Sequence, residues 1–131
     1  MVFDASTLVG AAMNSDGVPY RAFRKARASS EVVLSRQVFQ EIREVLHRAR
    51  LSRFLDPELR DDLLDQLISG AVWYEPDVTV TECRDAGDNK YLDLALAAGA
   101  AVIVSSDNDL LTLDPWRGVR ILRPADYLAS A

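Results

Sequence analysis

Cysteine and histidine are scarce in this chain of 131 residues, which has one of each, Cys83 and His47. A lone cysteine cannot form an internal disulfide, and we expect a reducing, cytoplasmic environment. The sequence offers no cysteine–histidine pair and no glycine-rich loop of the kind that holds phosphates. The chemistry of the protein therefore has to come from other residue types.

Long apolar runs are also missing. No run approaches the ~20 residues that a helix needs to cross a bilayer, and the N-terminus lacks a basic stretch before an apolar one, so we expect no membrane span and no signal peptide. Apolar residues make up 49% and charged residues 27% of the chain, as in an ordinary soluble domain. The length predicts a single domain over residues 1–131.

Basic residues are outnumbered by acidic ones, 15 to 20, which gives a formal net charge of −5. This balance argues against a nonspecific nucleic-acid binder with a basic face. It leaves room for an enzyme whose acids hold metal ions, because bound cations reverse the local field. The basic residues gather in two stretches, with Arg21, Arg24, Lys25 and Arg27 in the first and Arg43, Arg48, Arg50 and Arg53 in the second. We interpret the second set as solvated, with contacts to RNA phosphates as the alternative.

Short apolar runs alternate with segments of helical periodicity along the whole chain. The runs predict strands at residues 1–4, 31–34, 71–74, 101–104 and 118–122, and helices at residues 6–13, 18–28, 36–50, 57–70, 89–98 and 124–129. Ser35 and Asp56 are suitable N-caps, and Gly70 and Gly99 are suitable helix ends. Strands that alternate with helices favour right-handed crossovers. The predicted fold is a three-layer α/β/α sandwich around a parallel sheet of four or five strands.

Several acids fall where such a fold brings segments together. Asp4 ends the first predicted strand and Asp107 follows the fourth, while Glu41 lies early in a helix and Asp88 precedes one. The carboxyl ends of parallel strands share the edge at which α/β folds bind ligands. Carboxylates with waters are the donors that Mg²⁺ or Mn²⁺ prefers, and such ions assist phosphodiester cleavage. The sequence thus indicates an acidic metal site.

Four short motifs carry these acids in order: VFDAS at residues 2–6, SRQVFQEI at 35–42, RDAGDN at 84–89 and SSDNDLL at 105–111. Together they resemble the PIN-domain ribonucleases, and in particular the toxins of bacterial toxin–antitoxin systems. The resemblance extends from Val2 to Leu128. Ser6 stands where the family commonly has Asn, and Ser105 where it commonly has Thr.

The resemblance implies a metal-dependent endoribonuclease that uses Mg²⁺ or Mn²⁺ to cleave RNA, with a small antitoxin as its protein partner. A homodimer is also common in the family, and the apolar part of the helix at residues 59–68 is one possible surface for it. The implied catalytic and metal-binding acids are Asp4, Glu41, Asp88 and Asp107. Possible further ligands are Asp85 and Asp109, and supporting residues are Ser6, Ser105 and Asn89.

Each acid alone also has a plainer interpretation. Asp4 and Asp88 can cap the helices that follow them, Glu41 can be a solvated helix residue, and Asp107 can be a turn residue. Asp93 is interpreted as a surface residue on the polar face of its helix. Trp73, Tyr74 and Trp116 are interpreted as packing residues in preference to base-stacking platforms.

Two whole-protein alternatives stand beside the nuclease. One is a PIN fold that binds RNA or a partner protein without cutting. The other is a phosphoacceptor domain, which also gathers acids at a sheet edge. Such a domain needs a lysine after a late strand as the partner of the phosphate, and no lysine follows Lys90. We therefore rank the phosphoacceptor alternative lower.

Overall fold

The strands of the fold run parallel and form two ladders that lie side by side. The computed structural model describes residues 1–130, and its sheet has the strand order β1 (Val2–Phe3), β4 (Val102–Val104), β5 (Arg120–Leu122). A second ladder pairs β2 (Val33–Leu34) with β3 (Val72–Trp73). The Val33 amide donates to the Met1 carbonyl at 2.9 Å and so places β2 beside β1.

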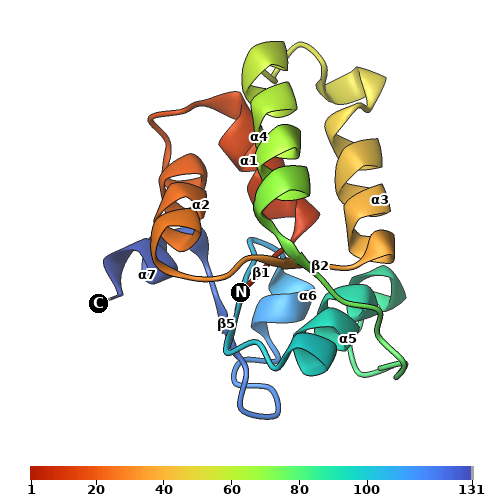
Figure 1. The fold of residues 1–131 in the computed structure, drawn as a ribbon. Helices are drawn as coiled ribbons and strands as arrows, with labels where there is room; N and C mark the ends of the chain where they lie inside the picture. The colour runs from red at the N-terminus through yellow and green to blue at the C-terminus, as the bar shows by residue number, and fades with distance from the viewer. Residues whose placement is uncertain (131) are drawn as a thin grey trace.

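The predicted α/β class with helices around a parallel sheet is confirmed. Figure 1 shows the strands in the middle of the molecule, with the first, third and fourth helices on one side and the fifth and sixth on the other. The difference from the expectation is that five strands are divided between a ladder of three and a ladder of two. The helices are α1 (Ala5–Met13), α2 (Val18–Ser29), α3 (Arg36–Leu46), α4 (Pro57–Gly70), α5 (Asn89–Ala98), α6 (Asn108–Leu111) and α7 (Pro124–Ala129), with 3₁₀ turns η1 (Ala49–Leu51) and η2 (Ala86–Asp88).

Polar side chains begin several of these helices, as the sequence predicts. Ser35 accepts a hydrogen bond from the Val38 amide at 3.1 Å, and Asp56 accepts from the Glu58 amide at 3.0 Å. Each bond satisfies an amide that the first turn leaves without an intrahelical partner. Gly99 ends α5 in the left-handed conformation, with φ of 63°, which glycine adopts without steric cost.

Several predicted boundaries differ from the structure by one or two residues, and the end of the third helix differs by four. The helix expected at residues 36–50 ends at Leu46 and continues as the separate turn η1, because the buried stripe stops at Leu46 and Ala49 and Arg50 are exposed. The last strand begins at Arg120 instead of residue 118. Gly118 belongs to a tight turn, in which Trp116 and Val119 exchange backbone hydrogen bonds of 2.8 and 2.7 Å.

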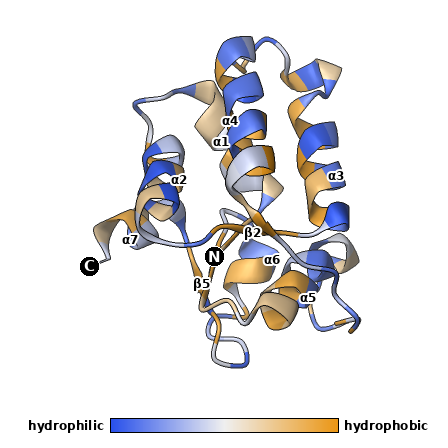
Figure 2. Cartoon of the chain, in the orientation of Figure 1, coloured by the Kyte–Doolittle hydropathy of each residue, from blue (hydrophilic) through white to orange (hydrophobic). Residues whose placement is uncertain are grey.

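The core lies between the strands and the inner faces of the helices. Figure 2 shows hydrophobic residues turned inward on the helices and hydrophilic ones outward. Phe3 of β1 packs edge-on against Phe23 of α2, with ring centroids 5.4 Å apart. This ring contact helps to hold α2 against the sheet, together with the packing of α2 on α1 and α7. No helix within residues 1–130 has the length and apolar character needed to cross a membrane.

Three apolar residues of α4 and β3 are exposed. Ile68 of α4 is 54% exposed, since Leu63, Leu64 and Leu67 fill the inward face of that helix. Trp73 was interpreted as a packing residue but is 45% exposed, because β3 has a paired neighbour on one side only in the described ladder. Val72 beside it is 38% exposed. By contrast Trp116 is buried, and its indole nitrogen donates to Glu82.

Candidate functional site

Asp4 lies at the end of β1 and is almost completely buried, with 2% of the residue exposed. Its carboxylate accepts hydrogen bonds from the Thr7 amide at 3.0 Å, from the Ser6 hydroxyl at 2.9 Å and from the Ser105 hydroxyl at 2.5 Å. Loss of solvation raises the pKa of Asp4, and these hydrogen bonds oppose that rise. Asp4 therefore caps α1 and is at the same time held in one orientation.

The two serines that contact Asp4 also fix the chain after β4. Ser105 accepts a hydrogen bond from the Asp107 amide at 2.9 Å, and Ser6 accepts one from the Ser106 amide at 3.3 Å. The hydroxyl groups thus bridge the carboxyl ends of the adjacent strands β1 and β4. This is how the fold brings Asp107 next to the end of the first strand.

Three acids form a tight cluster at this edge. One carboxylate oxygen each of Asp85, Asp88 and Asp107 lies within 4.8 Å of the others. Two of them are held by local caps, since Asp85 accepts from the Gly87 amide and Asp107 from the Asp109 amide, both at 2.9 Å. Their side chains are therefore ordered before any ligand arrives.

Asp88 is the least satisfied member of the cluster. It is 9% exposed, and its Oδ2 atom is buried without a hydrogen-bond partner in the part of the chain that the structure describes. Its pKa is raised to about 8, chiefly by burial and then by the hydrogen bond to Asp107 and the negative charges of Asp107, Asp85 and Asp4. In the absence of a cation the cluster therefore retains a proton near neutral pH.

The predicted capping role of Asp88 is wrong. Asp88 has a helical backbone, with φ of −90° and ψ of −9°, and its side chain makes no capping bond. The reason is that η2 leads directly into α5, so that the first amides of α5 already have carbonyl partners, as in the bond from the Asn89 amide to Ala86. The carboxylate is left to face the other acids.

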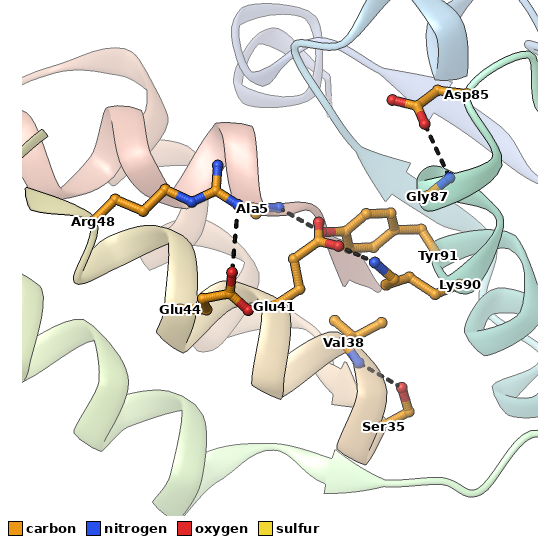
Figure 3. Close-up of polar contacts among 10 residues, drawn as sticks. All are labelled: Ala5, Ser35, Val38, Glu41, Glu44, Arg48, Asp85, Gly87, Lys90 and Tyr91. Atoms are coloured by element: carbon orange, nitrogen blue, oxygen red, sulfur yellow. Dashed lines mark hydrogen bonds and ion pairs between the residues drawn. The ribbon is translucent and has the colours of Figure 1, made fainter. Parts of the chain in front are cut away.

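Glu41 is directed toward α5 and lies outside the cluster of three. Figure 3 shows its carboxylate between Lys90 and Tyr91, which are both on α5. Lys90 forms an ion pair with it, and the Tyr91 hydroxyl donates to it at 2.6 Å. The same hydroxyl accepts from the Ala5 amide at 3.1 Å. Burial raises the pKa of Tyr91, and the hydrogen bond to Glu41 and the negative charge of Glu41 raise it further. The Tyr91 hydroxyl therefore stays a neutral donor.

The remaining predicted residues shape the loop before α5. The Asn89 side chain accepts a hydrogen bond from the Cys83 amide at 2.9 Å. The Cys83 thiol contacts the Asp109 carbonyl at 3.5 Å. The contacts of Asp109 thus run through its backbone. Asp93 was expected on the surface and is instead buried. Its carboxylate accepts a hydrogen bond from the Val80 amide at 2.7 Å, which makes the buried position possible. These bonds hold the segment that delivers Asp85 and Asp88.

Lys90, Tyr91 and Asp93 are the residues that sequence reasoning missed. The ion pair of Lys90 with Glu41 spans 49 positions, and no local pattern indicates a contact of that length. The one available signal was Tyr91 itself, since a tyrosine within an apolar helix stripe needs a partner for its hydroxyl.

A divalent cation fits this donor set. The three clustered side chains are carboxylates, which are hard oxygen ligands, and an unpartnered buried oxygen on Asp88 is a lone acceptor that a cation would satisfy. A cation would also remove the like-charge repulsion that raises the pKa of Asp88. The residues present are therefore suited to hold a metal ion of this class.

The contacts of Tyr91 lead to a prediction about stability. Tyr91→Phe leaves the Glu41 carboxylate with Lys90 but without its hydroxyl donor, and it leaves the buried Ala5 amide without an acceptor. The free energy of unfolding should therefore fall by about 1–3 kcal/mol. Urea denaturation measures the change. Tyr20→Phe is the matched control, because its hydroxyl has no hydrogen bond among residues 1–130, and it should change stability by less than ~0.5 kcal/mol. Equal losses of stability in Tyr91→Phe and Tyr20→Phe would contradict the role of the Tyr91 hydroxyl as a bridge between Glu41 and Ala5.

The raised pKa of Asp88 predicts a pH dependence of the metal-free protein. Between the ordinary value of 3.8 and about 8 the folded state keeps a proton that the unfolded chain has lost, so this group lowers stability as the pH rises. In EDTA the melting temperature of the wild type should therefore fall more steeply over this window than that of Asp88→Asn. Parallel melting profiles for the two proteins would show that Asp88 titrates normally.

Comparison with known proteins agrees with this geometry. The family model described as PIN domain matches residues 1–109, a range that includes every predicted site residue. The uncharacterized protein MJ1680 of Methanocaldococcus jannaschii is 27% identical over 115 residues, which cover 86% of this chain and 74% of that protein. PIN domains are generally nucleases, and they typically use divalent metals. Because the match extends over most of the chain, this protein belongs to the PIN domain family.

Proposed function

We propose that this protein is a metal-dependent endoribonuclease that hydrolyses phosphodiester bonds in RNA. The observation that carries the proposal is the cluster of Asp85, Asp88 and Asp107, whose oxygens lie within 4.8 Å of one another. Membership of the PIN family supports the hydrolase class. The motif resemblance supports RNA as the substrate.

The three clustered acids would hold the cation, which we propose to be Mg²⁺ or Mn²⁺. When bound there, such an ion would supply a water of lowered pKa and positive charge against the scissile phosphate. Asp88 would give up its retained proton to such a cation, because the positive charge offsets both the burial and the neighbouring negative charges that raise its pKa. Asp85 and Asp107 keep their places through their local caps.

Asp4 and Glu41 complete the proposed acidic set. Asp4 adds negative charge next to Asp88, and through Ser105 it fixes the backbone of Asp107. Glu41 is held at the start of α5 by Lys90 and Tyr91. Through these contacts both acids position the ends of β1, β4 and α5 relative to the cluster.

We further propose that the protein is the toxin of a toxin–antitoxin pair, with a small antitoxin protein that covers the acidic centre. A homodimer is part of the same proposal, with the exposed Ile68 of α4 as one contact. The motif resemblance is the support for both. The inert PIN fold that binds without cutting is the competing function, and the two experiments below separate them.

The first experiment is RNA cleavage by the purified protein with Mg²⁺, with Mn²⁺ and with EDTA. Asp88→Asn and Asp107→Asn should each lower the rate roughly 100-fold or more, since a cation supplies several kcal/mol of charge stabilisation. Asp65→Asn is the control, because Asp65 is an exposed acid on α4. If wild type and site variants cut alike, the activity comes from a contaminant. If nothing cuts while the metal raises the melting temperature, the inert binding role holds.

The second experiment tests the toxin role by expression in bacteria. Wild-type protein should arrest growth, because uncontrolled cleavage depletes cellular RNA, and Asp88→Asn at the same protein level should not. Co-expression of a small protein encoded next to this gene should restore growth. Unimpaired growth with the wild type at high expression, together with cleavage in vitro, would leave a ribonuclease that is not a toxin.

A further inference from the structure

A groove between α3 and β3 carries aromatic and cationic side chains together. It has a volume of about 530 Å³, and its lining includes Arg36, Phe39 and Arg43 of α3 and Trp73 of β3. A second hollow, lined by Gln40, Arg43, Glu44 and His47, continues it along the outer surface of that helix, and its acid Glu44 is paired with Arg48. The groove lies on the β3 side of α3, whereas Glu41 of the same helix faces α5.

Trp73 is unusual for a residue on a strand of this small domain. It is 45% exposed, although its ring meets Phe39 edge-on at 5.5 Å between centroids. Transfer of an indole ring from water to a buried site is favourable in free energy. An exposed indole that a second ring holds in place is therefore a preformed surface on which a base can stack. Such surfaces accept any base, because every base has a π-face.

The cations of the groove are free to meet an anion. Neither Arg36 nor Arg43 forms an ion pair with any of residues 1–130. Arg43 lies over the Phe39 ring at 5.9 Å, which orders its guanidinium without neutralising it. The acid in the lining, Glu75, is exposed and makes no ion pair with them either. In a chain of net charge −5, two unpaired arginines beside an exposed tryptophan form a local site for phosphate and base together.

We propose that this groove binds single-stranded RNA, with a base on Trp73 and phosphates at Arg36 and Arg43. The proposal rests on the proposed ribonuclease function and adds to it a binding surface apart from the acidic cluster. A helix is about 10–12 Å across with its side chains, so one RNA strand can pass over α3 from the groove to the side that carries Glu41. The groove then holds the RNA beside the acids, which by themselves repel it.

Two protein occupants fit the groove less well. A second copy of this chain in a two-fold contact would bring the same arginines face to face, and each copy carries a net charge of −5. A peptide that extends the sheet would rely on backbone bonds to β3, which has two residues. The unpaired cations favour a polyanion over both.

The test is binding of a fluorescein-labelled single-stranded RNA of mixed sequence to the full-length protein, measured by anisotropy in EDTA so that no metal-dependent cleavage occurs. Trp73→Ala should weaken binding about 5- to 150-fold, the loss that removal of one base-stacking ring produces. The double variant Arg36→Ala/Arg43→Ala should lower the salt dependence of log K by about 1.4, since each phosphate contact on a single strand contributes ~0.7. Trp73→Phe keeps a stacking ring and should retain most of the affinity.

Two matched controls remove an exposed aromatic and an exposed arginine elsewhere. Phe54 is 51% exposed and Arg24 lies on the outer surface of α2, and Phe54→Ala and Arg24→Ala should bind like the wild type. Equal losses in the groove variants and the controls would show diffuse binding and overturn the proposal. Unchanged RNA affinity in Trp73→Ala would overturn it as well, and a change in oligomeric state by sedimentation in that case would assign the groove to a protein partner.

Binding and cleavage fail separately in these experiments. Asp88→Asn should lose cleavage in Mg²⁺ or Mn²⁺ but keep the anisotropy response in EDTA. If the wild type binds through Trp73 and cuts nothing, the ribonuclease proposal fails and the groove stands. If the wild type and Trp73→Ala bind RNA and cut it equally well, the groove proposal fails and the ribonuclease stands.

Discussion

The buried carboxylate of Asp4 is the constraint on which the rest of the site depends. A charge with 2% exposure costs several kcal/mol of solvation unless hydrogen bonds replace the lost water. Its donors come from the start of α1 and from Ser105 at the end of β4. The solvation of one acid is therefore coupled to the pairing of β1 with β4, and Ser105 passes that coupling to the backbone of Asp107. A site assembled in this way is rigid before any ligand binds.

The acids divide into satisfied and unsatisfied ones. Asp4 and Glu41 have hydroxyl, amide or ammonium partners, so the protein itself meets their need for hydrogen bonds. Asp88 has a buried oxygen without a partner among the described residues and a pKa raised to about 8. Perturbed groups of this kind are common at functional sites, where burial and neighbouring like charges shift pKa values. The division favours the cluster over Asp4 and Glu41 as the place where the proposed cation would bind.

Local features of the fold were predictable from the sequence and distant ones were not. Ser35 and Asp56 cap their helices, and Gly99 ends one, through contacts with residues a few positions away. Capping rules that use the local sequence therefore predict these roles. The approach of Asp4 to Asp107 followed from parallel strands sharing one edge. The partners of Asp93 and Glu41 lie 13 to 50 positions away, and periodicity carries no information on such pairs. Asp88 was mistaken for a cap because a 3₁₀ turn before a helix leaves no mark in the sequence.

The exposure of Trp73 belongs to the same class of unpredictable features, because it depends on which strand lies at the edge of a ladder. Its position bears on how an acidic protein approaches an acidic polymer. At physiological ionic strength charges are screened over about 8 Å, which is less than the ~10–12 Å width of the helix between the groove and Glu41. Each side of α3 therefore acts through its own charges and not through the net charge of −5. Arg36 and Arg43 attract phosphate where they lie, and the acids become compatible with phosphate once a cation is bound. The overall charge, which counted against nucleic acid in the sequence, does not determine what this surface binds.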